Sequence, residues 1–177
     1  MDTGLSTIGA SSGKYYMETK ITGTASGITR TMFGLTDERN GNEVAEDKFI
    51  TNFSNGDTIG YYTGSMTKNG SSVSGSWSTY GINDILGMYV DLDNHYVYFS
   101  KNGVMENSGD PTSGSSGTGG VSFATGQTYL FGITTYGGGA AQMNFGSPPY
   151  AVSSGNADPN GYGNFEYGTQ NYYALNT

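Results

Sequence analysis

Residues 85–104, ILGMYVDLDNHYVYFSKNGV, decide the fold of this chain. Two runs of apolar and aromatic residues flank a short polar stretch, a pattern that predicts two antiparallel strands joined by a tight turn. With Asn94-His95 as a two-residue loop, the register pairs Asp93 with Tyr96, Leu92 with Val97, Asp91 with Tyr98 and Val90 with Phe99. Asn102-Gly103 favours a second tight turn directly after the hairpin.

This register gives the hairpin two different faces, because side chains alternate across a strand. One face carries Val90, Leu92, Val97 and Phe99, and the other carries Asp91, Asp93, Tyr96 and Tyr98. The first is apolar and the second is polar and aromatic, as expected of a hairpin that covers a core on one side. A slip of one residue would mix the faces, so the pattern specifies the pairing.

The composition favours strands and turns over helices. Only 34% of the residues are hydrophobic, but the chain has 30 glycines, 15 tyrosines and 8 phenylalanines, so aromatic side chains must fill much of the core. Aromatic residues suit a pleated sheet and glycine suits tight turns. No long run shows apolar residues at helical spacing.

Charge and residue usage exclude several classes of function. The net charge is −8 with only seven Lys and Arg, so we expect neither nucleic acid nor an anionic membrane surface as a partner. No apolar run is long enough to insert into a membrane. The absence of cysteine excludes disulfides and thiolate metal sites. We expect no cofactor.

The rest of the chain continues the pattern of short strands. Alternating or apolar runs predict strands at 14–21, 30–36, 58–66, 71–77, 128–136 and 141–145, and a short strand at 48–53. Asn69-Gly70 predicts a second hairpin, in which Met66 faces Val73. Many short strands separated by turn signals indicate an all-β fold, a two-sheet antiparallel β-sandwich.

Several segments, in order along the chain, resemble the strands of SPRY domains. They are GKYYMETKI (13–21), MFGLTD (32–37), GDTIGY (56–61), DILGMYVDLDNHYVYFSKNGV (84–104) and YLFGITTYGGGAAQMNFGSPPY (129–150). The resemblance implies a SPRY/concanavalin-like jelly roll, although His95 stands where the family's turn usually has Gly. We therefore expect a lead-in segment at 1–12, a SPRY-like β-sandwich at 13–150 and an aromatic-rich extension at 151–177.

The low charge and the tail GYGNFEYGTQNYYALNT (161–177) resemble the SPRY-like modules of bacteriophage virion proteins. That resemblance implies a domain of a longer tail fibre or structural protein, located in the virion and, within a fibre, a homotrimer. Two roles remain open. One is a module that recognises a host glycan or protein, and the other is a capsid decoration or tail connector that docks on other virion subunits.

Candidate residues for chemistry are few. His95 is the only histidine and fits a turn. Asp91 and Asp93 could act in glycoside hydrolysis or bind a hard cation, but they more simply hold a neighbouring strand and the turn. The acidic stretch 37–47 could supply calcium ligands through Asp37, Glu38, Glu43, Glu46 and Asp47, but a solvated loop explains it better. We expect no enzyme and no metal site.

Aromatic residues are the more informative set, because stiff rings bind sugars and peptides at low entropic cost. The resemblance implies recognition through loops at one end of the sandwich, and the residues expected there are Arg39, Tyr61, Tyr62, Trp77, Tyr80 and Tyr136. For docking on a neighbouring subunit the candidates are Tyr162, Phe165, Tyr167, Tyr172 and Tyr173.

Overall fold

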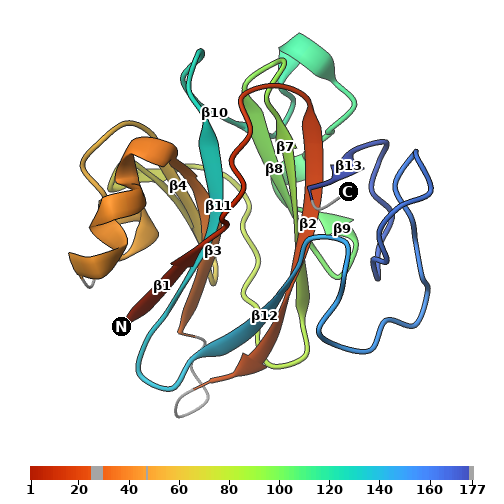
Figure 1. The fold of residues 1–177 in the computed structure, drawn as a ribbon, viewed down its shortest axis with the longest axis horizontal. Helices are drawn as coiled ribbons and strands as arrows, with labels where there is room; N and C mark the ends of the chain where they lie inside the picture. The colour runs from red at the N-terminus through yellow and green to blue at the C-terminus, as the bar shows by residue number, and fades with distance from the viewer. Residues whose placement is uncertain (25–29, 47, 176–177) are drawn as a thin grey trace. The chain divides into compact units, whose positions relative to one another are not determined.

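The computed structural model describes residues 1–24, 30–46 and 48–175, and strands joined by turns dominate it (Figure 1). The strands form two sheets. The chain divides into two compact units, and each sheet lies mainly in one of them. The first unit is Met1–Ser11, Thr22–Ile82 and Phe123–Ala140, and the second is Ser12–Ile21, Asn83–Ser122 and Ala141–Thr177. The predicted all-β class with two mostly antiparallel sheets is confirmed.

The first sheet is antiparallel throughout. Its order is β1 (Asp2–Leu5), β11 (Tyr129–Thr135), β3 (Thr31–Asp37), β4 (Thr58–Tyr62), β5 (Ser65–Lys68) and β6 (Ser71–Val73). Asn69 and Gly70 both have positive φ, 49° and 73°, and form the predicted turn between β5 and β6. Met66 faces Val73 as expected. The segment expected to be a lead-in contributes the edge strand β1.

The second sheet contains the central hairpin. Its order is β10 (Val121–Ser122), β8 (Tyr96–Lys101), β7 (Ile85–Asp91), β2 (Lys14–Gly23) and β12 (Ala140–Asn144), with β9 (Val104–Met105) on β8 and β13 (Tyr173–Ala174) parallel to β2. Two short 3-10 helices, η3 (Glu106–Ser108) and η4 (Gly114–Ser116), follow β9.

The register of the hairpin is two residues away from the predicted one. Val90 faces Val97 and Asp91 faces Tyr96. The loop therefore has four residues, 92–95, and the predicted two-residue loop is wrong. A shift of two keeps each paired side chain on its original face of the strand, so the predicted division into an apolar and a polar-aromatic face holds although the pairing does not.

The side chain of Asp91 explains the longer loop. Its carboxylate accepts hydrogen bonds from the backbone N–H groups of Asp93 and Asn94 and from the Asn94 side-chain amide, at 2.9–3.1 Å. His95 ends the loop in the left-handed region with φ 63°, a conformation that His tolerates better than most residues. A short polar side chain thus fixes the turn, which periodicity alone cannot reveal.

The C-terminal segment covers the part of the polar-aromatic face that carries Tyr89 and Tyr98, and both side chains are buried. Tyr16, Tyr89 and Tyr98 pack with Phe165 and Tyr172 in one cluster. The ring centroids of Tyr16 and Phe165 lie 5.0 Å apart, and those of Tyr89 and Tyr172 lie 5.7 Å apart in an edge-to-face arrangement. Phe165, Tyr172 and Ala174 of the C-terminal segment are thus part of the second unit's own core. The predicted domain boundaries remain a prediction.

Glu18 anchors this C-terminal segment from β2. Its side chain is fully buried. It accepts hydrogen bonds of 2.8–3.3 Å from the hydroxyls of Tyr16 and Tyr150, the Asn144 side-chain amide and the backbone N–H groups of Glu166 and Tyr167. Burial raises the pKa of Glu18, and the hydrogen bonds counteract this in part.

Residues 48–53 do not form the predicted strand. They contain η2 (Ile50–Asn52), a 3-10 turn that contacts β3 and β4. β3 is already paired on both sides, with β11 and β4, so a further segment can pack only on its face. Ile50 and Thr51 are buried there. The preceding 3-10 helix η1 (Glu38–Glu46) occupies the stretch that was expected to be a loop.

Candidate functional site

Three glycines lie side by side in the first sheet, and two of them, Gly60 and Gly132, allow η2 to lie close to it. Gly34 faces Gly132 on one side and Gly60 on the other. A Cβ atom on Gly60 would lie 2.5 Å from Cγ2 of Thr51 and 2.6 Å from Sδ of Met32. Contacts this short would force Thr51 or Met32 to move, so glycine at position 60 allows the segment to pack closely on the sheet.

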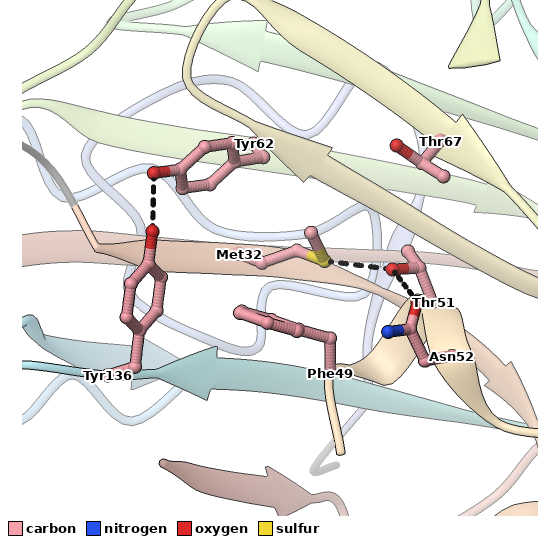
Figure 2. A pocket seen from close by; sticks show the side chains of 7 residues that line it. All are labelled: Met32, Phe49, Thr51, Asn52, Tyr62, Thr67 and Tyr136. Carbon is pink, nitrogen blue, oxygen red and sulfur yellow. Dashed lines mark hydrogen bonds between the residues drawn. The ribbon is translucent and has the colours of Figure 1, made fainter. Parts of the chain in front are cut away.

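A groove remains at the margin of η2. It has a volume of about 240 Å3 and is lined by Met32, Phe49, Thr51, Asn52, Tyr62, Thr67 and Tyr136 (Figure 2). Met32 faces Tyr62 in the ladder between β3 and β4, so both side chains stand on the same face of the sheet. The neighbouring strands β3, β4 and β5 thus form the floor of the groove, and η2 together with Phe49 forms one wall.

Two tyrosines close the aromatic end of the groove. The hydroxyls of Tyr62 and Tyr136 are 2.8 Å apart and share a hydrogen bond (Figure 2). Phe49 meets the Tyr136 ring edge-to-face at 5.2 Å, and the Arg30 guanidinium lies over that ring at 5.1 Å. Burial, together with the neighbouring Tyr136 hydroxyl, raises the pKa of Tyr62 to about 12, so this hydroxyl stays protonated at neutral pH.

The other end of the groove is polar. Thr51, Asn52 and Thr67 lie there, as Figure 2 shows. The Thr51 hydroxyl donates to Sδ of Met32 at 3.6 Å or to Oδ1 of Asn52 at 3.5 Å, which are long contacts. The groove therefore combines an apolar and aromatic section with amide and hydroxyl groups that can bond to a ligand.

Of the six residues expected to bind a partner, the structure brings Tyr62 and Tyr136 together in this groove. Tyr61 and Tyr80 are instead buried, and their rings meet edge to face with centroids 5.1 Å apart. Trp77 packs on Tyr61 at 6.0 Å and donates its indole N–H to the Val73 carbonyl at 3.3 Å. These three side chains support the fold.

Arg39 does not line the groove. It forms a two-point salt bridge with Asp37, from Nε at 2.9 Å and from Nη2 at 2.7 Å. Burial alone would raise the pKa of Asp37, but the hydrogen bonds and the charge of Arg39 hold it below its usual range. Because Arg39 is more than half exposed, the pair contributes little to stability.

The sequence did not indicate the other groove residues. The sequence places Phe49, Thr51 and Asn52 in the predicted strand at 48–53 and Met32 in the predicted strand at 30–36. A signal was present in the glycines at positions 34, 60 and 132, one on each of three apolar strands. This signal can be interpreted only once the strand pairing shows that the three glycines are neighbours in the sheet.

The acidic side chains have structural partners. Asp91 pairs with Lys14 at 2.8 Å, and Oδ1 of Asp93 accepts the backbone N–H of Gly13 at 2.8 Å. Glu43 pairs with Lys48 at 2.9 Å. Within the described part of the chain, no group of three or more His, Asp or Glu side chains is arranged to hold a metal ion. Asp47 and the side chain of Glu46 lie outside the described residues.

The aromatic residues of the tail separate into two groups. Phe165 and Tyr172 are fully buried in the chain's own core, so in this fold their rings are not available for docking. Tyr167 is half-buried, and its backbone N–H donates to Glu18. Tyr162 is 59% exposed and Tyr173 is 39% exposed, so only these two are open to a partner among the five. Docking by the tail remains a prediction.

Sequence comparison gives no relative, since no protein-family model matches the chain and no curated protein matches it. Comparison of structures gives a match in fold: the crystal structure of the SPRY domain of human HERC1 matches with a TM-score of 0.56 over 80% of each chain. The fold is SPRY-like. The two chains share 15% sequence identity, so the SPRY-like likeness concerns the fold alone. Among the described residues no helix is long and apolar enough to span a membrane.

Proposed function

We propose that this chain is a non-enzymatic binding module that holds a segment of another protein in the groove beside Tyr62 and Tyr136. The observation that carries the proposal is a preformed concave site with rigid aromatic walls. Tyr136 is held by Phe49, Arg30 and the Tyr62 hydroxyl, so little side-chain entropy is lost when a ligand binds.

The lining favours a peptide over other ligands. Met32 and Phe49 give an apolar surface for one side chain, and the amide of Asn52 is suited to a backbone N–H or C=O group. A nucleic acid would need cations, and the chain has only seven. The carboxylates that could have served catalysis, Asp91 and Asp93, hold a strand and a turn, which supports a binding role rather than hydrolysis.

We propose further that the module belongs to a bacteriophage virion and that its partner is a protein or glycan on the host surface. The support is the resemblance of the low-charge, tyrosine-rich tail to such modules. The alternative role, docking on neighbouring virion subunits, is supported by the exposure of Tyr162 and Tyr173. If the alternative holds, replacing both tyrosines by serine should prevent assembly into particles and leave the groove intact.

A selection from a random peptide library on the immobilised chain tests the binding role. Enriched peptides should shift the backbone amide signals of Met32, Asn52 and Tyr62 in nitrogen-15 NMR spectra. Failure to enrich any sequence, or shifts confined to residues away from the groove, would contradict the proposal. For the virion role, the isolated chain should slow adsorption of particles to host cells, and unchanged adsorption would contradict it.

A further inference from the structure

A second pocket lies in the second unit, where the C-terminal segment returns to β2. Its volume is about 290 Å3, and its lining includes Lys14, Tyr15, Asn160 and Tyr173. Three separate segments meet there: the start of β2, the turn at 158–161 and β13. The first groove has an apolar floor, whereas this pocket is lined by two phenol rings and an amide, and the Lys14 ammonium is turned to the other face of β2.

Two tyrosines form an aromatic platform in this pocket. Tyr173 and Tyr15 are direct partners in the parallel pairing of β13 with β2. Their neighbours Tyr16 and Ala174 are buried, so alternation places Tyr15 and Tyr173 on the opposite side. Tyr173 is 39% exposed and Tyr15 is half-buried, which leaves aromatic surface open to a ligand.

A buried carboxylate fixes the polar part of the pocket relative to this platform. Asp158 is 5% exposed. Its Oδ1 accepts the backbone N–H groups of Asn160 and Tyr162 at 2.9 Å, and its Oδ2 accepts the N–H of Ala174 at 3.1 Å. The turn that carries Asn160 is therefore tied to the strand that carries Tyr173. This preorganisation lowers the cost of binding.

The charge in the pocket is balanced. Lys14 pairs with Asp91 at 2.8 Å and lies over the ring of Tyr172 at 5.6 Å. An anionic ligand would gain little from a lysine that already has a carboxylate partner, in a protein of net charge −8. A neutral ligand with several hydroxyl groups can accept a hydrogen bond from the Asn160 amide, and its C–H face can stack on Tyr173.

We propose that this pocket binds a neutral saccharide, with one pyranose ring stacked on Tyr173 and a hydroxyl bonded to the side-chain amide of Asn160. The pocket is separate from the peptide groove, and the two binding activities do not depend on each other. Millimolar affinity is expected for a single sugar ring, because so small a ligand makes few contacts.

Nitrogen-15 NMR titration of the whole chain tests this, with the methyl glycosides of glucose, galactose and N-acetylglucosamine as probes and inorganic phosphate as the anionic arm. At least one glycoside should shift the amides of Lys14, Tyr15, Asn160 and Tyr173. Tyr173→Ala should weaken binding at least tenfold, whereas Tyr173→Phe should keep it, because stacking does not need the hydroxyl. Tyr162→Ala is the matched control and should bind as the wild type does.

Three results would overturn the proposal: no glycoside shifts these amides, phosphate shifts them and the glycosides do not, or Tyr173→Ala binds as well as the wild type. The spectrum of each variant reports whether the fold is intact. The amide signal of Met32 in the same spectra reports on the peptide groove. The saccharide proposal can therefore fail without contradicting the proposal for the groove.

Discussion

The hydroxyl groups of Tyr62 and Tyr136 lie 2.8 Å apart, so the last residue of β4 touches the residue that follows β11 across the intervening strand β3. This contact closes one end of the groove. It joins two segments 74 residues apart in the sequence, and it is the only pair among the six expected binding residues that meets in the groove.

A double-mutant cycle on this pair should show coupling. Removing one hydroxyl, by Tyr62→Phe or Tyr136→Phe, should lower the free energy of unfolding by about 1 kcal/mol. The double variant should have nearly the same free energy of unfolding as either single variant. Urea denaturation of the four proteins measures this. Strictly additive losses would mean that the two hydroxyls do not interact in solution.

The pKa of Tyr62 gives a prediction for alkaline pH. Its pKa is raised to about 12 in the folded chain, whereas an unfolded tyrosine titrates near about 10. The folded state therefore holds this proton more tightly, so its contribution to stability is complete below about pH 10 and is lost as pH rises through about 12. NMR titration with carbon-13-labelled tyrosine measures the pKa directly. In Tyr136→Phe the pKa of Tyr62 should move back towards 10, and an unchanged value would show that Tyr136 has no part in the shift.

Glu18 should control whether the C-terminal segment stays in place. Glu18→Ala leaves buried donors without an acceptor and should cost about 3 kcal/mol of unfolding free energy. Glu18→Gln keeps one carbonyl oxygen as an acceptor for the buried donors, so it should lower the free energy of unfolding by less than Glu18→Ala does. Hydrogen exchange at the amides of Glu166 and Tyr167 measures the effect locally, and both should exchange faster in each variant. Unchanged protection of these amides in Glu18→Ala would contradict the anchoring role.

Gly60 should be sensitive to the addition of a single methyl group. Gly60→Ala forces Thr51 or Met32 to move and should cost about 1–3 kcal/mol. Gly4→Ala is the matched control, because it lies in the same sheet and its new Cβ meets no atom within 4 Å. Thermal unfolding of both variants measures the difference. Equal stability of the two would show that η2 does not press on the sheet at this point.

The sequence predicts the hairpin of β7 and β8 and its two faces, but not its register. Alternation distinguishes a register from one shifted by a single residue, and it cannot distinguish a shift of two. The Asp91 side chain decides between them through hydrogen bonds to Asp93 and Asn94. Likewise, residues 161–175 read as an aromatic tail, whereas Phe165 and Tyr172 fill the face above Tyr16 and Tyr89.

The candidate site could be predicted only in part for a similar reason. Tyr62 and Tyr136 were indicated because aromatic residues at strand ends suit recognition. Tyr61 was indicated by the same rule, yet it is buried, since neighbouring positions in a strand point to opposite sides. Phe49 reaches the groove through η2, a turn whose close approach to the sheet depends on glycines in two different strands, Gly60 and Gly132.

The affinity of one selected peptide for three proteins tests the groove most directly. Thr67→Arg places a long charged side chain at the polar end of the groove, and Ser71→Arg adds the same charge to an exposed position on β6 that does not line it. Calorimetry should show similar dissociation constants for the wild type and for Ser71→Arg. The dissociation constant of Thr67→Arg should be at least tenfold higher, a loss of about 1.4 kcal/mol of binding free energy. Equal affinity for all three proteins would contradict binding in the groove.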